Sequence, residues 1–192
     1  MFSLTAPSDD EVRRVIATQK DSGFSYPEVG ASANSVPTGY NLDRNRIRLG
    51  SGETAWQQAV QAIRTWQMFS MPWLRFYWPS APVQPGTEIA VSVYHFGFYS
   101  LNASRVVYVI DEDGPIRRFG VAHGTLAEHA ESGEERFSVE WHRNDESVWY
   151  DILAFSRPRS MLARFGRPFS RSLQKKFAEA SKLAMLHSVN HT

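Results

Sequence analysis

Five extended segments, separated by turns, follow one another between residues 87 and 156 of this 192-residue chain. They are rich in β-branched and aromatic residues and are bounded by turn-forming residues, as β-strands are. Asp113-Gly114 and Asn144-Asp145, which lie between neighbouring segments, are typical of hairpin turns. Successive hairpins predict an antiparallel sheet, with strands at 87–96, 101–111, 116–125, 135–143 and 148–156.

The last part of the chain predicts a long amphipathic helix. Pro158 suits a first helical turn, and Gly166 and Pro168 indicate a helix end with a second start, or a kink. Apolar residues nevertheless recur every three or four positions, at Leu162, Phe165, Phe169, Leu173, Phe177, Ala180 and Ala184. A helix so late in the chain must bury that face on something built earlier, so we expect it to cross the sheet.

The first 80 residues predict fewer strands and more helix. Ser8 and Glu11 form a capping-box pattern, which marks a helix start. Alternating Arg44, Arg46 and Arg48 indicate a strand with one wet face. The expected elements are a helix at 8–20, a loop at 21–39, a strand at 40–49, a helix at 51–68 and a short strand near 73–78.

Composition narrows the classes of function. The 21 basic and 20 acidic residues nearly cancel, so we expect neither nucleic acid nor membrane as a partner. Cysteine is absent, which excludes disulfides and thiol chemistry. The N-terminus has no signal-peptide pattern and no segment is apolar enough to span a bilayer, so we expect a soluble, cytoplasmic protein. No cofactor is predicted, and the oligomeric state stays open.

The order of elements resembles the START-like helix-grip plan of lipid-transfer, polyketide-cyclase and pollen-allergen proteins. Six local motifs together resemble the bacterial and plant family known as domain of unknown function nineteen-ninety, across about residues 24–185. They are FSYPEVG (24–30), RLGSGE (48–53), SLNASRVVYVIDED (100–113), FGVAHGT (119–125), GEERF (133–137) and VWYDILAFSRPR (148–159). No reaction or ligand is assigned to that family, so the resemblance implies the fold alone.

We therefore predict an α+β, helix-grip (START-like) fold, in which a curved antiparallel sheet of about seven strands wraps around a long C-terminal helix. We expect a single domain over residues 1–192. Residues 1–39 would pack on its body as a helix and loop, and residues 40–188 would form the helix-grip core. Aromatic residues make up 13% of the chain. They favour either a well-filled core or a ligand cavity between sheet and helix.

Strand alternation indicates which side chains would line such a cavity. Arg105 favours the outside, which places Asn102, Ser104 and Tyr108 inward. Tyr94, Phe96 and Tyr150 are further candidates by the same alternation. Tyrosine and asparagine in an apolar shell can orient a small ligand through one or two hydrogen bonds. Their polar groups can equally be paired with backbone or water.

Two histidines and an ion pair are the remaining candidates. His123 and His129 flank an acidic loop, and a histidine beside a carboxylate is the minimum for proton transfer. Their spacing fits no metal motif, so no metal is predicted. Arg136 and Asp151 can pair across the sheet, either as a surface ion pair or on the cavity floor. The predicted ligand-binding residues are Tyr94, Asn102, Tyr108, His123, Arg136 and Tyr150.

Three functions stay open. The first is binding of a small, largely apolar ligand between the sheet and the C-terminal helix. The second is an enzyme acting on such a ligand by acid–base chemistry through His123, Tyr108 or Glu135. The third is an interaction module that presents a basic helix face, formed by Arg157, Arg159, Arg164, Arg167, Arg171, Lys175 and Lys176.

Overall fold

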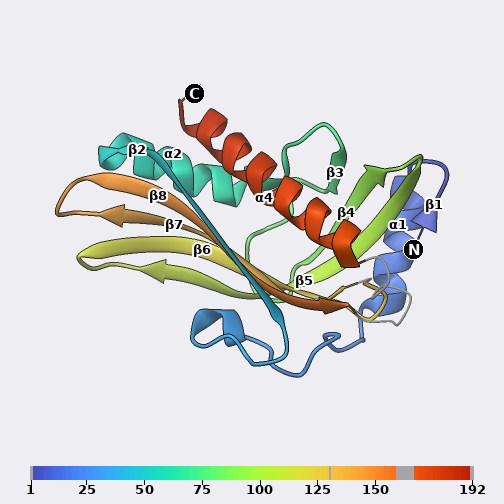
Figure 1. The fold of residues 1–192 in the computed structure, drawn as a ribbon. Coiled ribbons are helices and arrows are strands. Elements are labelled where there is room, and N and C mark those ends of the chain that lie inside the picture. The colour runs from blue at the N-terminus through green and yellow to red at the C-terminus, as the bar shows by residue number, and fades with distance from the viewer. Residues whose placement is uncertain (1, 130, 159–166, 191–192) are drawn as a thin grey trace.

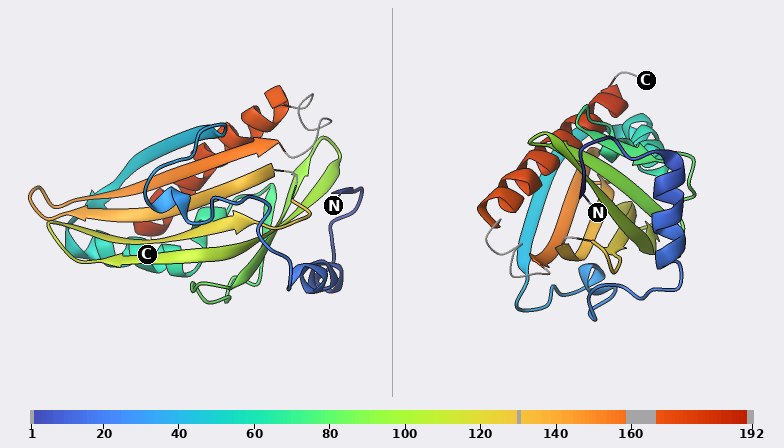
Figure 2. Two further views of the ribbon diagram at one scale, coloured as in Figure 1. Left: turned by 90° about the horizontal axis from the view of Figure 1, so that it is seen from below. Right: turned by 90° about the vertical axis from the view of Figure 1, so that its right-hand side faces the viewer.

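An antiparallel sheet curls around one long helix near the C-terminus, α4 (Arg167–Asn190), which crosses its concave face (Figure 1). The structure, a computed structural model, describes residues 2–129, 131–158 and 167–190. Figure 2 shows the curvature from two further directions, with α4 lying along the open side of the sheet. This is the helix-grip arrangement that the sequence predicts.

Seven strands form one continuous path in the order β2-β8-β7-β6-β5-β4-β3. They are β2 (Asn41–Ser51), β3 (Leu74–Tyr77), β4 (Glu88–His95), β5 (Phe98–Glu112), β6 (Ile116–Thr125), β7 (Glu131–His142) and β8 (Ser147–Pro158). Strands β3 to β8 pair consecutively and antiparallel, as the predicted hairpins require. Strand β2 pairs with β8, so the first long strand of the chain lies beside the last one. A two-residue strand that the sequence does not predict, β1 (Phe2–Ser3), pairs with β5.

The first helix, α1 (Asp9–Gln19), begins as the capping-box pattern predicts. The Ser8 side chain accepts a hydrogen bond from the Glu11 amide at 3.3 Å, and the Glu11 carboxylate accepts one from the Ser8 amide at 2.7 Å. Val12 then packs with Tyr77 and Leu101 in a small cluster of buried residues beside β4 and β5.

The helix expected over 51–68 is divided in two. An α-helix, α2 (Gly52–Arg64), is followed by a short 3₁₀ helix, η2 (Gln67–Phe69). The reason is Trp66, whose φ of 57° lies in the left-handed region and cannot continue an α-helix. The Trp66 indole N–H donates to the carbonyl of Ala81 at 2.9 Å, which fixes the ring in the core.

The loop between α1 and β2, which includes a 3₁₀ turn at η1 (Ala31–Ala33), packs on the side of the sheet away from α4. The anchor is Glu134, which is only 2% exposed. Its carboxylate accepts hydrogen bonds from the Tyr26 hydroxyl at 2.6 Å, the Gly30 amide at 2.8 Å and the Ser32 amide at 3.0 Å. A side chain at Gly124 would collide with the Tyr26 ring, so this glycine allows the close approach.

The core is filled at one end of the curved sheet. Helix α2 and the C-terminal half of α4 cover that end, where Trp56 stacks on Trp141 at 6.3 Å between ring centroids. Met185 and Val189 of α4 are buried in the same cluster. At the other end, the N-terminal half of α4 lies over the sheet, together with Phe69 of η2 and Trp73.

Some expectations differ from the structure or lie outside what it describes. The strand expected at 135–143 begins earlier, because β7 starts at Glu131, and the loop before it is correspondingly shorter. Pro158 ends β8 and Pro168 lies in the first turn of α4. The helix expected before Gly166, and with it Arg159 and Arg164, falls outside the described residues.

Candidate functional site

A cavity of about 650 Å³ lies between the concave face of the sheet and the N-terminal half of α4. It occupies the end of the sheet that α2 leaves uncovered. Its walls come from β4, β5, β6, β7 and β8, and Leu173 and Phe177 of α4 close it from above. The volume is within the range of about 300–1,000 Å³ that is usual for small-molecule sites.

Most of the lining is apolar. One wall is aromatic, because Phe69 of η2 contacts Phe137 and Phe177 at ring-centroid distances of 5.5 and 5.9 Å and separates the cavity from the filled core. The other apolar side chains come from strands, from α4 and from the segment before β3. They are Trp73, Leu74, Ile89, Val91, Val93, Phe98, Ile152, Ala154, Leu173 and Ala178.

Two facing polar side chains, His123 of β6 and Glu135 of β7, interrupt this apolar lining. They are direct partners in the strand register, so both point to the concave face. The Nε2 atom of His123 lies 3.7 Å from Oε2 of Glu135, which is longer than a hydrogen bond. Both ring nitrogens of His123 are buried and have no hydrogen-bond partner within the described part of the chain.

Burial sets the protonation of this pair. It lowers the pKa of His123 to about 3, helped by the nearby charge of His129. Burial also raises the pKa of Glu135 to about 8, and the negative charge of Asp43 adds to the shift. Near neutral pH the imidazole is therefore uncharged and the carboxyl group is mainly protonated.

Further polar groups lie on β5. Asn102 and Ser104 both line the cavity, as the alternation of this strand predicts. The Asn102 amide makes long hydrogen bonds, 3.4 Å to the carbonyl and 3.3 Å to the hydroxyl of Ser100. These bonds are at the weak end of the usual range, so the amide can reorient toward a bound molecule.

Basic side chains of α4 are held beside the cavity. Arg171 forms a bidentate ion pair with Asp43 of β2, with Nη2 2.8 Å from Oδ1. Lys176 lies over the Trp73 ring, 4.9 Å from its centroid. Burial, and next the charge of Lys176, lower the pKa of His95. Two of the predicted basic residues are thus engaged with the body of the protein.

Two of the six predicted ligand-binding residues, Asn102 and His123, line the cavity. Tyr108, expected to point inward, lies instead on the outer face, where its hydroxyl is 2.6 Å from the Ser32 hydroxyl. The reason is a bulge: the pairing of β5 with β6 shifts between Val106 and Tyr108, which reverses the alternation beyond that point.

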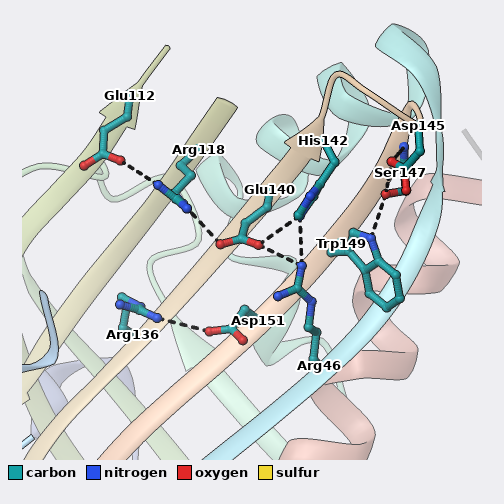
Figure 3. A network of polar contacts seen from close by, with 10 residues as sticks. All are labelled: Arg46, Glu112, Arg118, Arg136, Glu140, His142, Asp145, Ser147, Trp149 and Asp151. Atoms are coloured by element: carbon teal, nitrogen blue, oxygen red, sulfur yellow. Dashed lines mark hydrogen bonds and ion pairs between the residues drawn. The ribbon is translucent and has the colours of Figure 1, made fainter. Parts of the chain in front are cut away.

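Arg136 also lies on the outer face, as Figure 3 shows. It donates to the Ser32 carbonyl at 2.9 Å and pairs with Asp151 at 3.1 Å. Of the two interpretations of the Arg136–Asp151 pair, the structure has the surface pair. Beside it runs a polar network on the same face, joining Arg46, Glu112, Arg118, Glu140 and His142 (Figure 3).

The two remaining tyrosines are also away from the cavity lining. Tyr94 is 49% exposed and packs against Tyr99 at a ring-centroid distance of 4.9 Å. Phe96, considered with it, is 77% exposed. Tyr150 is fully buried, and its hydroxyl lies 2.8 Å from that of Ser181 on α4. It therefore joins the sheet to the helix.

Glu135 is a cavity residue that the predicted ligand-binding set lacks, although it appears among the proton-handling candidates. A signal for it was present in the sequence. Glu135 is in phase with Phe137, Val139 and Trp141 on the predicted strand, and an alternating apolar face points to the core.

The described residues hold neither a metal-ligand cluster nor a helix suited to cross a membrane. No cluster of three or more histidine, aspartate or glutamate side chains is arranged to hold a metal ion in residues 2–129, 131–158 and 167–190. In the same ranges, no helix combines the length and the apolar character that crossing a bilayer requires.

Known proteins resemble this chain over most of its length. A protein of Dictyostelium discoideum named "UPF0548 protein" is 32% identical, covering 98% of this chain and 96% of the relative. One of the same name from Deinococcus radiodurans is 34% identical, covering 93% of each. Among solved structures, a hypothetical protein of Helicobacter pylori matches with a TM-score of 0.55 at 13% identity, covering 88% of this chain and 96% of that one. This last likeness concerns the fold alone.

The family model described as "Domain of unknown function (DUF1990)" matches residues 25–184. That range takes in β2 to β8, α2 and most of α4, and therefore every wall of the cavity. With this match and the relatives above, the chain belongs to the DUF1990 family.

Proposed function

We propose that the protein binds a small, largely apolar ligand in the cavity between the sheet and α4. The observation that supports this most is the cavity itself, about 650 Å³ of mostly apolar space, with polar side chains such as Asn102, His123 and Glu135 in its lining. A concave, mostly apolar space of this size with several polar groups in its lining is the usual form of a small-molecule site.

A second candidate is an enzyme that performs acid–base chemistry on the same ligand. The observation in its favour is the raised pKa of Glu135, about 8, since a proton donor works best when its pKa is near the working pH. His123 argues the other way, because a group with a pKa of about 3 is a poor base at neutral pH. Binding therefore ranks ahead of catalysis.

The interaction module has less support. Its basic face depends on free cations, whereas Arg171 pairs with Asp43 and Arg157 lies over the Tyr40 ring, 4.6 Å from its centroid. Lys176 lies on Trp73. The cavity between the sheet and α4 is a further reason to prefer ligand binding over the interaction module.

Fluorescence titration with N-phenyl-1-naphthylamine, a neutral apolar dye, tests the proposal. We expect wild-type protein to bind the dye, and Ala154→Phe, which fills the cavity from β8, to weaken binding at least about tenfold, or about 1.4 kcal/mol. Leu183→Phe is the control, because Leu183 is on the exposed side of α4, 62% exposed. It should bind like wild type.

The proposal fails if wild-type protein does not bind the dye. It also fails if folded Ala154→Phe, checked by circular dichroism, binds as tightly as Leu183→Phe. Val91→Phe fills the same cavity from β4 and replaces Ala154→Phe if that variant does not fold.

A further inference from the structure

The spacing between His123 and Glu135 suits a bridging atom. At 3.7 Å, the two side chains are too far apart to bond to each other. A single oxygen atom, however, can lie about 2.8 Å from both Nε2 and Oε2, which is a normal hydrogen-bonding distance. Both side chains line the cavity, so a bound ligand can supply that oxygen.

The pair also needs a partner. Both ring nitrogens of His123 are buried without a hydrogen bond within the described residues. The Glu135 side chain, which is 23% exposed, makes no hydrogen bond there either, and its one polar contact is with His123. Leaving a buried polar group unpaired costs about 1–3 kcal/mol. The phenyl rings of Phe69 and Phe137 flank His123 at centroid distances of 6.0 and 5.6 Å, so its apolar neighbours offer no substitute.

The surrounding charges favour an uncharged partner. The charges acting on the pair are those of Asp43 on Glu135 and His129 on His123. Asp43 is itself neutralised by Arg171, and Lys176, the cation on the next turn of α4, lies on Trp73. Arg44 and Lys175 also line the cavity, but both are exposed, and neither is among the charges that act on His123 or Glu135. Within the described residues, a ligand anion at this place would therefore have no cation beside the pair.

A protonated carboxyl group and a neutral imidazole have complementary roles. The Glu135 O–H donates a hydrogen bond and an unprotonated ring nitrogen of His123 accepts one. A hydroxyl group accepts the first and donates the second. An ether oxygen can only accept, and it leaves the ring nitrogen unpaired.

We infer that the ligand is an alcohol or phenol, whose uncharged hydroxyl group lies between His123 and Glu135 while its apolar body fills the cavity. This inference rests on the proposed binding function and specifies its ligand class. Sites that hydrogen-bond a substrate hydroxyl reject analogues that lack it, because their own polar groups are then left unpaired.

Isothermal titration calorimetry near pH 7 with three matched compounds tests this inference. They are 2-naphthol, 2-methoxynaphthalene and 2-naphthoate, which share an apolar body and differ in the head group. We expect wild-type protein to bind 2-naphthol at least about tenfold more tightly than either of the others, or about 1.4 kcal/mol.

Variants assign the preference to the pair. His123→Phe keeps a ring of similar shape and should bind 2-naphthol and 2-methoxynaphthalene equally. His142→Phe makes the same substitution on the outer face, where His142 contacts Arg46 and Glu140, and should keep the wild-type preference. Glu135→Leu should also bind 2-naphthol and 2-methoxynaphthalene equally. This variant replaces His123→Phe in the test if His123→Phe does not fold.

The results separate the two proposals. Equal binding of 2-naphthol and 2-methoxynaphthalene by wild-type protein would overturn the hydroxyl inference and leave the binding function standing. Tightest binding of 2-naphthoate would overturn it too, in favour of an anionic head group. If no compound binds and the neutral dye does not bind either, the binding function itself is wrong.

Discussion

His123 and Glu135 show how position alone can set the chemistry of a residue. Each would be an ordinary exposed side chain on the outer face of the sheet. On the concave face, burial lowers the pKa of His123 and raises the pKa of Glu135. Both side chains are therefore uncharged near neutral pH. The cavity is therefore more apolar than a count of its ionisable residues suggests.

Glu135→Gln should change how stability depends on pH. The folded-state pKa of Glu135, about 8, exceeds its ordinary value of 4.5, so the folded protein holds this proton more tightly than the unfolded chain does. Wild-type protein therefore loses stability as pH rises from about 4.5 to about 8, and the variant lacks this loss. We expect the variant to gain at least about 1.4 kcal/mol relative to wild type over that window.

Urea unfolding at a series of pH values measures this difference. The control is Glu128→Gln, a substitution of an exposed acid in the loop before β7. Parallel pH profiles for wild type and Glu135→Gln would show that the carboxyl group is not held protonated in the folded protein. The depressed pKa of His123 acts in a separate window, because it costs stability as pH falls from 6.5 toward about 3.

Glu134 has the opposite role to its neighbour, since it is fully paired on the outer face. Glu134→Ala leaves the Tyr26 hydroxyl and the amides of Gly30 and Ser32 without their acceptor. We expect a loss of about 2–4 kcal/mol in the free energy of unfolding, measured with urea. A loss below about 0.5 kcal/mol would mean that the loop at 21–39 does not depend on this anchor.

At the residue scale, alternation predicts orientation correctly until the backbone interrupts it. Asn102 and Ser104 point inward as predicted, whereas Tyr108, a few residues further along β5, points outward. The bulge between Val106 and Tyr108 accounts for the difference. A bulge adds a residue without a distinctive sequence signal, so the alternation pattern alone cannot locate it.

At the scale of elements, α4 is held by specific bonds as well as by apolar packing. Its N-terminal half is tied to β2 through Arg171 and Asp43, and its middle to β8 through Tyr150 and Ser181. These contacts fix the helix over the cavity. The height of α4 above the sheet, and with it the cavity, depends on them.

Tyr150→Phe should weaken this attachment. The substitution removes one hydroxyl from a fully buried pair and leaves the Ser181 hydroxyl without it, at a cost of about 1–2 kcal/mol in urea unfolding. A double-mutant cycle with Ser181→Ala isolates the interaction, since the double variant should cost little more than either single one. Strictly additive effects would show that the two hydroxyls do not interact.

The elements themselves were largely predictable, because local signals mark them. Turn residues such as Asp113-Gly114 mark the hairpins, and the capping box at Ser8 marks α1. The interruption at Trp66 was not predictable from pattern, because its left-handed conformation is imposed by tertiary contacts such as the indole bond to Ala81. The pairing of β2 with β8 joins segments about 100 residues apart, and no local pattern in the sequence indicates it.

At the scale of the whole molecule, the curved sheet has a filled end and a hollow end. Helix α2 and the later part of α4 fill the first, and the N-terminal half of α4 lies over the second. The sequence predicts the layers but does not decide between a filled core and a cavity. Which of the two forms depends on how far α2 extends along the sheet and on the distance between α4 and the sheet. No local sequence pattern determines either of these.

The most direct test of the central claim is native mass spectrometry of the protein purified from its own organism. The account predicts that wild-type protein carries a non-covalent small molecule, and that Ala154→Phe purified in the same way carries none. A wild-type spectrum with the mass of the bare chain alone, or the same adduct on Ala154→Phe, would contradict it.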